Sequence, residues 1–285
     1  MNTVVRLARA EDKDAVLAFT QKTWDWGDYI QYVWDDWLSA ANGELAVAEV
    51  DGAVAGITMT TILGPGEGWL QGLRVHPDYR RHGMARQLTA HQLDWLRQRG
   101  VTVARLAVHH HNIPSQTLVA QTGFRRLASF VSVEQTLKDV ATTDAVCEAV
   151  PPAQADAAWR MIEGSPTLAA AAGLWGRGWA WQRLTRSIVA EQASQGHVLG
   201  VRESDRWAAL AIVSRDDDGQ LIGYADGAGP AVERLAHAVT QQAKTAGAAF
   251  ISAMLPPVPH IVAAFRRAAC PSSDPGAIYV YGLPL

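Results

Sequence analysis

The chain has very little cysteine and no long apolar run. Its 285 residues include two cysteines, Cys147 and Cys270, which lie far apart and have no histidine or cysteine neighbours at metal-ligand spacing. A disulfide framework or a zinc site is therefore not indicated, and both thiols are expected to be inert. No segment reaches the ~20 uninterrupted apolar residues that a membrane span needs, and the N-terminus shows no basic-then-apolar leader. We expect a soluble, cytoplasmic protein without a membrane partner.

The chain also lacks an excess of charge of either sign. Lys and Arg number 25 against 28 Asp and Glu, which gives a formal net charge of −3. Because no basic field is available to neutralise a phosphate backbone, no nucleic-acid partner is expected. With 48% hydrophobic residues and no low-complexity tract, the composition is that of a folded protein, and the length favours two domains.

The first half predicts strands and helices that alternate in a mixed sheet. Asp51-Gly52 is a strong hairpin signal between two aliphatic runs, and Gly100 is expected to cap the end of a long amphipathic helix. The expected strands are 4–7, 45–50, 54–63, 69–75, 101–108 and 124–137, and the expected helices are 11–22, 29–40, 84–99 and 113–121. The order βααβββαβαβ predicts an α/β (α+β) fold, with helices on the faces of the sheet.

The second half repeats this outline after a change of composition. A small-residue stretch that runs into Val150-Pro151-Pro152 predicts a linker at 141–152, between domains 1–140 and 153–285. The expected helices are 153–163, 182–195, 231–246 and 258–269, and the expected strands are 197–202, 207–214, 221–225, 248–254 and 278–283. Gly247 follows a long helix as Gly100 does, which indicates an internal duplication.

A basic loop distinguishes the first half from the second. The segment HPDYRRHG, residues 76–83, lies between a predicted strand and a predicted helix, whereas the second half has only DGAGPA at that place. The first amides of a helix and the macrodipole favour an anion, Gly83 permits close approach or a positive φ, and the arginines supply donors for phosphate. The ligand indicated is a pyrophosphate; a solvated basic turn is the alternative.

Two motifs in this half resemble signatures of the GNAT acetyltransferase superfamily. Val75-x-Pro77-x-x-Arg80-Arg81-x-Gly83-x-Ala85 is similar to the acyl-CoA loop, and Asn112-x-x-Ser115-x-x-Leu118-x-x-x-x-Gly123-Phe124 is similar to the second signature. The resemblance covers about residues 3–137. It extends weakly, without the motifs, over 146–284, so that it implies two GNAT-like domains in tandem, the second degenerate, each with a mixed, splayed sheet.

The resemblance implies acetyl-CoA as the co-substrate and assigns residues to it. The diphosphate would rest on the amides of the loop, pantetheine would pair with the strand that ends at Val75, and Asn112 would contact the pantetheine arm. The implied cofactor-binding residues are Leu73, Val75, Arg80, Arg81, His82, Gly83, Met84, Ala85, Asn112 and Ser115. The Val75 N–H is also placed to stabilise an oxyanion.

The chain departs from the family pattern at its catalytic positions. Val119 stands where many members have the acidic Tyr, Gln71 where many have Glu, and Ala107 where some have a base. Strand alternation puts His109 on the same face as Ala107, so His109 is the first candidate for the general base and Glu67 the second. Adjacent strand residues face opposite sides, so the histidines at 109–111 do not indicate a metal site; filling the strand end or binding CoA is the alternative role.

The acceptor side has aromatic and acidic residues. Residues 23–38, TWDWGDYIQYVWDDWL, interleave Trp24, Trp26, Trp34 and Trp37 with four aspartates, a composition that suits a cationic amine. The predicted substrate contacts are Asp25, Asp28, Tyr29 and Gln71, although a core role for the tryptophans and a solvated acidic face are the alternatives. The cluster LWGRGWAWQRL at 174–184 either closes the acceptor site or seals an interface between the domains.

These features lead to one leading hypothesis and two rivals. The first is an acetyl-CoA-dependent N-acetyltransferase that acts on a primary amine of a small molecule, an amino acid or related metabolite, by direct attack and without a metal. No covalent acyl-enzyme is expected, because Cys147 falls in the predicted linker and Cys270 in the degenerate half. The rivals are acetylation of a protein amine and a non-catalytic acyl-CoA sensor. The oligomeric state is left open.

Overall fold

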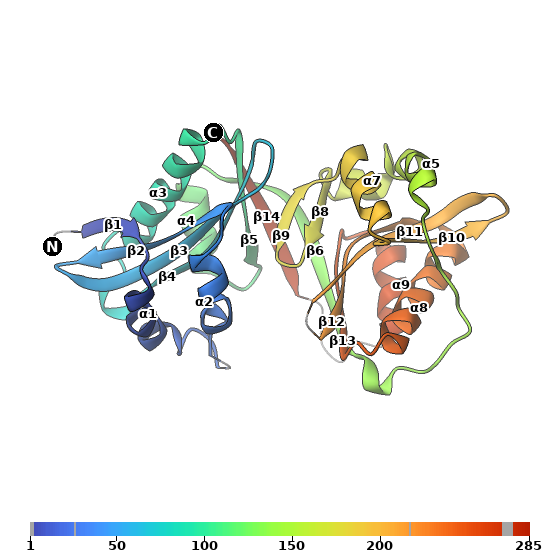
Figure 1. The fold of residues 1–285 in the computed structure, drawn as a ribbon, viewed down its shortest axis with the longest axis horizontal. Coiled ribbons are helices and arrows are strands. Elements are labelled where there is room, and N and C mark those ends of the chain that lie inside the picture. The colour runs from blue at the N-terminus through green and yellow to red at the C-terminus, as the bar shows by residue number, and fades with distance from the viewer. Residues whose placement is uncertain (1–2, 26, 217, 270–275) are drawn as a thin grey trace. The chain divides into compact units, whose positions relative to one another are not determined.

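The computed structural model describes residues 3–25, 27–216, 218–269 and 276–285, which form two compact units (Figure 1). The first unit consists of Met1–Leu106, Asn112–Arg125 and Tyr281–Leu285. The second consists of Ala107–His111 and Arg126–Val280. Trp26 and Cys270, which the sequence analysis singled out, lie outside the described residues. Each unit contains a sheet with helices on its faces, as predicted.

The first unit is built on four antiparallel strands and one parallel neighbour. Strand β4 pairs with β3 in antiparallel and with β5 in parallel, the latter from Glu67↔Val103 to Trp69↔Arg105. The strands are β1 (Thr3–Leu7), β2 (Gly43–Val50), β3 (Ala53–Gly64), β4 (Glu67–Val75) and β5 (Val103–His109). The helices are α1 (Lys13–Thr20), α2 (Ile30–Leu38), α3 (Met84–Gln98) and α4 (Ile113–Gln121). This element order confirms the prediction.

The sheet of the first unit is covered on both faces because successive strand residues point to opposite sides. Val47 on β2 packs with Val16 and Trp34 of α1 and α2. Ala48, the next residue, packs with Met84 and Leu88 of α3. Both faces are therefore apolar, which explains the near-continuous aliphatic runs of β2 and β3.

The predicted turns of the first unit are confirmed by backbone conformation. Asp51 and Gly52, between β2 and β3, have φ values of 50° and 88°, the two positive angles that a tight type I′ hairpin requires. Gly100, after α3, has φ of 70° and ends the helix in the left-handed region.

The second unit has the same layered plan. Strands β10 to β12 pair in antiparallel, β12 pairs with β13 in parallel, and β6 pairs with β13 in antiparallel. The strands are β6 (Arg125–Thr136), β7 (Glu148–Ala149), β8 (Leu174–Arg177), β9 (Ala180–Arg183), β10 (Val198–Glu203), β11 (Arg206–Arg215), β12 (Gly219–Gly227), β13 (Phe250–Leu255) and β14 (Ala277–Pro284). The helices are α5 (Ala155–Ile162), α6 (Pro166–Ala170), α7 (Arg186–Ser194), α8 (Gly229–Thr245) and α9 (Pro259–Ala269).

Two cores support this second sheet. Leu235 and Val239 of α8 and Phe265 of α9 pack on one face with residues of β10 to β13, and α8 and α9 lie side by side (Figure 1). On the other face, Ala158 of α5 and Val189 of α7 pack with Trp175 and the strands.

The β8–β9 hairpin corrects one element prediction. The helix predicted at 182–195 begins only at Arg186, because Ala180–Arg183 is a strand that pairs with Leu174–Arg177 around the tip at Gly178, whose φ is 60°. Strands of four residues give too short an alternation to be recognised. The predicted linker also contains a short strand, since Glu148–Ala149 pairs with β10.

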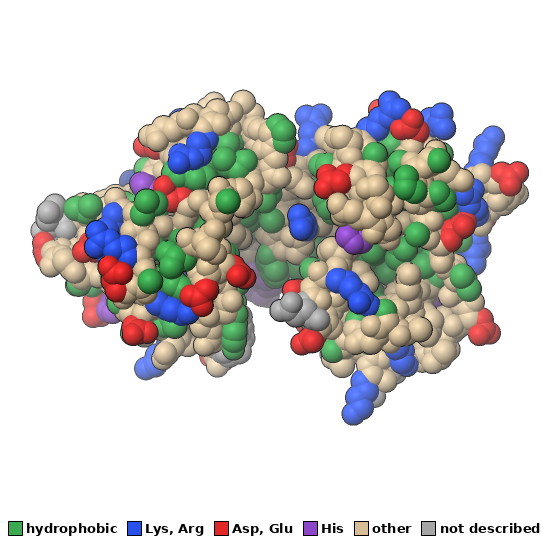
Figure 2. Space-filling model, in the orientation of Figure 1, with side chains coloured by type: hydrophobic (Ala, Val, Ile, Leu, Met, Phe, Trp, Pro, Cys, Tyr) green, Lys and Arg blue, Asp and Glu red, His purple; other side chains and the backbone are tan. Residues whose placement is uncertain are grey.

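The units do not follow the predicted boundaries at 140 and 153. Most of β6 belongs to the second unit, and the last five residues belong to the first, where the Leu285 N–H donates to the Thr102 carbonyl at 3.0 Å. The domains 1–140 and 153–285 thus remain a prediction about the repeat in the sequence. In the part of the chain that the structure describes, no helix is long and apolar enough to cross a membrane. On the face shown in Figure 2, acidic and basic side chains are interspersed within each unit.

Candidate functional site

The end of strand β4 is shaped by a β-bulge. Ile57 pairs with Arg74 and Met59 with Gln71, so that two residues of β4, Gly72 and Leu73, lie opposite Thr58 alone. Gly72 has φ of 69°, and a Cβ there would come within 2.6 Å of the Trp37 ring. Glycine is therefore required at the bulge, which bends the strand and redirects the residues after it.

The bulge and the strand pairing orient the main chain of Val75. The N–H of His76 donates to the Ala55 carbonyl of β3 at 2.8 Å. Because amides alternate between the two edges of a strand, the N–H of the preceding residue, Val75, points away from β3. The described pairing of β4 with β5 ends at Trp69↔Arg105. The amide that sequence analysis proposed for the oxyanion is thus directed to the edge that β3 does not cover.

The loop after β4 presents a run of unpaired amides. The N–H groups of Tyr79 and Arg80 donate back to the carbonyls of His76 and Pro77. The next N–H groups with a backbone acceptor are those of Arg86 and Gln87, which both donate to the Gly83 carbonyl. Among the residues that the structure describes, no acceptor is found for the N–H groups of 81–85. Arg81 and Gly83 both have positive φ, 65° and 80°. Such alternating backbone forms a concave anion site, here at the N-terminus of the 15-residue helix α3.

The surroundings of this loop leave room for a bulky anion. A Cβ built on Gly83 would meet nothing within 4 Å, so the left-handed conformation, rather than packing, explains the glycine. Met84 is buried beneath the loop, whereas Arg81 and His82 are exposed and Arg80 Nε donates to the Val75 carbonyl at 3.2 Å. The open space, the free amides and two guanidinium groups fit a diphosphate.

Helix α4 brings the second motif into the first unit. Asn112 is its N-cap, and its Oδ1 accepts the Ser115 N–H at 3.1 Å. This oxygen is engaged in the cap, so the side-chain amide nitrogen is the group of Asn112 left for a ligand. Arg86 of α3 donates to Gln121 of α4 at 3.1 Å, and this bond joins the loop helix to the helix of the second motif.

The structure corrects the role predicted for Asp28. Its side chain is only 2% exposed, and both carboxylate oxygens accept from Arg74, at 2.8 Å from Nε and 3.3 Å from Nη2. The carboxylate is therefore neutralised inside the protein and not presented to a substrate ammonium. Asp25 is exposed in the loop before α2, as predicted for a contact residue.

Arg74 is the residue of this region that sequence analysis missed. Its guanidinium lies 4.6 Å from the centroid of the Trp24 ring and 5.3 Å from that of Tyr29, so it occupies the aromatic faces proposed for a substrate cation. Burial raises the pKa of the Tyr29 hydroxyl. The available signal was a charged residue in an otherwise apolar strand, one position before the loop's Val75.

Glu67 is not brought to the loop. It is the first residue of β4, eight positions before Val75, and its carboxylate lies 3.0 Å from Arg105 Nη1, with both side chains largely buried. The separation along an extended strand is roughly 26 Å. Glu67 is therefore an ion-pair partner of Arg105, which corrects its assignment as a base at that end of the strand.

His109 is the last residue of β5, whose end from Ala107 onward belongs to the second unit, and it lies in a cluster of three imidazoles. Its ring centroid is 4.7 Å from that of His110 and 5.4 Å from that of His111. Burial first, and then the neighbouring imidazoles, lower the pKa of His109 from its usual value, so the ring is neutral near pH 7. Within the described part of the chain, no three His, Cys, Asp or Glu side chains are grouped as metal ligands would be.

Comparison with known proteins identifies the family of the first unit's motifs. Residues 13–124 match the model of the Acetyltransferase (GNAT) family. The chain therefore contains a GNAT acetyltransferase domain, an acyltransferase whose co-substrate is acetyl-CoA, and the resemblance seen in the sequence is confirmed for this part. A search of curated protein sequences gave no match.

Solved structures confirm the fold along the whole chain. A GCN5-related N-acetyltransferase from Sphaerobacter thermophilus is 15% identical, with a TM-score of 0.67, and the match covers 99% of this chain and 95% of that one. A Thermoplasma acidophilum protein that carries a provisional acetyltransferase name is 16% identical, with a TM-score of 0.62, over 99% of this chain and 100% of that one.

Proposed function

We propose, from the GNAT acetyltransferase domain in residues 13–124, that the chain transfers the acetyl group of acetyl-CoA to a primary amine of a small molecule. The observation that carries this proposal is the run of unpaired amides at 81–85 in front of helix α3. It supplies main-chain donors for a diphosphate and leaves open space above Gly83. Acetyl-CoA supplies the activated thioester, and the residues of the chain bind and orient acetyl-CoA and the acceptor amine.

The same geometry suggests how the first unit holds the co-substrate. The amides of 81–85 and the Arg81 guanidinium hold the diphosphate, and the edge of β4 near Leu73 and Val75 pairs with the amides of pantetheine as a peptide strand would. The Val75 N–H, which points away from β3, donates to the carbonyl oxygen as it becomes negative. Asn112 contributes its side-chain amide nitrogen.

Amine attack also requires removal of a proton, because an ammonium has no lone pair. Val119 and Gln71 supply neither the Tyr nor the Glu that many relatives use, and Glu67 is paired with Arg105. His109 remains the proposed general base. Its lowered pKa keeps the imidazole neutral, and a neutral imidazole can accept the proton directly or through water.

The proposed acceptor contacts are the exposed Asp25 and the side chain of Gln71 on β4. The Arg74 guanidinium already covers the rings of Trp24 and Tyr29, and its charge is balanced by Asp28. The acceptor amine is therefore not expected to bind as a cation on these two rings. Acetylation of a protein amine is the second candidate, and the missing Tyr and Glu favour a third, an acyl-CoA sensor.

A thiol-release assay with acetyl-CoA tests this proposal. A panel of small primary amines, amino acids and peptides should release CoA with at least one small amine. Release with peptides alone would favour the protein modifier, and silence together with an acetyl-CoA thermal shift would favour the sensor. Arg81→Ala and Gly83→Glu should abolish the thermal shift. Arg97→Ala, at the exposed far end of the same helix, is the matched control and should retain it.

A further inference from the structure

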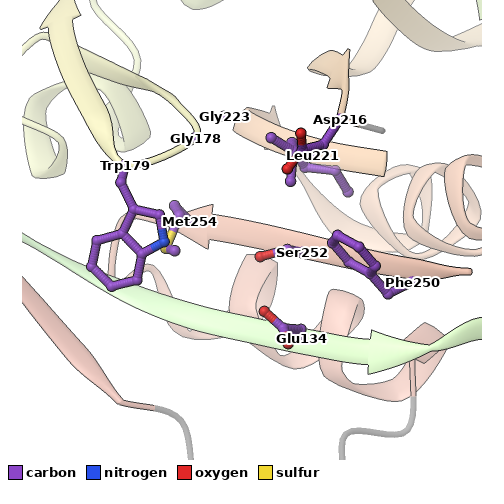
Figure 3. A pocket seen from close by; sticks show the side chains of 10 residues that line it. Glu134, Gly178, Trp179, Asp216, Leu221, Gly223, Phe250, Ser252 and Met254 are labelled. Atoms are coloured by element: carbon purple, nitrogen blue, oxygen red, sulfur yellow. The ribbon is translucent and has the colours of Figure 1, made fainter. Parts of the chain in front are cut away.

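The second unit contains a pocket made from its own strands and hairpin. Its floor is formed where β12 and β13 run in parallel and β6 pairs with β13, and the tip of the β8–β9 hairpin lies at its side (Figure 3). The cavity has a volume of about 180 Å³ and opens to solvent. This is smaller than the pockets that enclose drug-sized ligands, so it suits only a small organic molecule.

One buried polar group is aimed into this pocket without a partner. Ser252 on β13 is 7% exposed, and Figure 3 shows its hydroxyl directed into the cavity. Within the described residues, no hydrogen bond of this hydroxyl is found. Because the cavity opens to solvent, this hydroxyl is available to donate to a bound ligand or accept from it in place of water.

The charge of the pocket is negative. Glu134 of β6 is directly opposite Ser252 in the antiparallel pair, so the two side chains share a face and lie close together. Asp216 is a second carboxylate in the lining, and none of the lining residues that the structure describes is a lysine or arginine. The Glu134 carboxylate beside Ser252 therefore attracts a cation.

The apolar side of the pocket carries an exposed tryptophan. Trp179 at the hairpin tip is 55% exposed, although the indole is large and apolar, and Phe250 and Met254 line the cavity with it. The hairpin is held tightly, because a Cβ on Gly223 of β12 would lie 1.6 Å from the Gly176 carbonyl oxygen. An indole beside carboxylates suits an organic cation through cation–π and apolar contact.

We propose that this pocket binds a small organic ammonium ion, with its cationic head between Glu134 and Ser252 and its apolar body against Trp179 and Phe250. The head donates to the Glu134 carboxylate and to the Ser252 hydroxyl. This site goes beyond the proposed acetyl transfer and does not depend on it. It gives the half that lacks the basic loop a ligand of its own.

Calorimetric titration of the full-length protein tests the site with three probes that share one body. Phenethylammonium is the cation, 2-phenylethanol the neutral analogue and 3-phenylpropionate the anion. We expect saturable binding of the ammonium, about tenfold or more tighter than binding of the alcohol, and no binding of the acid. Equal affinity for the ammonium and the alcohol, or no binding of the ammonium, would overturn the proposal.

Variants locate the binding within the pocket. Glu134→Gln should weaken it about tenfold and Trp179→Ala about threefold, since the carboxylate and the indole face are lost. Glu191→Gln, an exposed carboxylate on α7 outside the pocket, is the control and should bind as the wild type does. Ser252→Ala is a small change on a buried strand, and it should also weaken binding because the hydroxyl that accepts from the ammonium is lost. Full affinity in all three pocket variants, each folded by circular dichroism, would contradict the assignment.

Discussion

Gly83 and Gly100 share a left-handed backbone, and their comparison separates conformation from ligand binding. Their φ values are 80° and 70°, and a Cβ at either position would meet nothing within 4 Å. An alanine should therefore cost each position the same backbone strain, about 1 kcal/mol of unfolding free energy. Only Gly83→Ala should also weaken acetyl-CoA binding, by about tenfold or more, because its methyl group enters the space above the amides.

Thermal unfolding with and without acetyl-CoA measures both effects. Both variants should lower Tm alike without the co-substrate, and only Gly100→Ala should keep the full stabilisation by acetyl-CoA. If Gly83→Ala keeps it too, the diphosphate does not lie over this glycine.

The Arg74–Asp28 pair is predicted to be structural. Arg74→Met should lower the unfolding free energy by about 3 kcal/mol, because it leaves a carboxylate that is 2% exposed without its partner. Lys13→Met, which breaks the exposed pair with Asp35, should change it by no more than about 0.5 kcal/mol. Urea unfolding gives both values, and equal effects of the two variants would show that Asp28 is not dependent on Arg74.

His109 predicts a pH dependence with a definite sign. Its pKa is lowered in the folded protein, so the unfolded chain binds the proton more strongly. The contribution of His109 to stability is therefore present above pH ~6.5 and is lost as the pH drops below it.

The same residue predicts the pH dependence of the rate. If the neutral imidazole is the general base, kcat/KM falls below pH ~6.5 and reaches a plateau above it. His109→Ala should remove that fall and lower the plateau. An unchanged rate profile would exclude His109 as the base.

At this scale, sequence reasoning reaches candidate site residues that are contiguous in the chain. The loop from Val75 to Ala85 could be recognised because strand end, glycine and helix start follow one another. The pairing of Asp28 with Arg74, 46 residues apart, depends on how α2 packs against the sheet, and a local pattern does not contain it. The same holds for Glu67 and Arg105.

At the scale of elements, the β8–β9 hairpin packs closely against β12 because Gly223 has no side chain. Gly223→Ala should lower the unfolding free energy by about 3 kcal/mol, since its Cβ would overlap the backbone of Gly176. It should also change the near-ultraviolet circular dichroism, because Trp175 and Trp181 are buried residues of this hairpin. Gly164→Ala, where a Cβ meets nothing, adds only backbone strain and is the control. A mild effect of Gly223→Ala would show that the hairpin can lift from β12.

The long elements were predictable and the short ones were not. Helices such as α3 and α8 extend over at least four turns, so their periodicity is clear, and Gly100 and Gly247 mark their ends. The hairpin strands have four residues each, and their glycines and tryptophans carry no alternation. These strands pair because the hairpin packs on the sheet, and no local pattern in the sequence predicts that packing.

At the scale of the whole molecule, the predicted repeat in the sequence and the two units in space have different boundaries. The first unit includes the last five residues of the chain, and most of β6 belongs to the second unit. Cutting the sequence at a linker therefore does not separate two self-contained folds. A boundary was predictable from composition, but the assignment of β6 and of residues 281–285 depends on strand pairing between distant segments.

The central claim is that the main-chain amides of 81–85 in the intact protein hold the diphosphate of acetyl-CoA. Backbone amide NMR of the ¹⁵N-labelled full chain tests it, with S-acetylpantetheine, which lacks the diphosphate, as the comparison ligand. We expect acetyl-CoA to move these amide protons downfield to saturation and S-acetylpantetheine to leave them in place. Saturable binding of acetyl-CoA with no movement of these amides would contradict it.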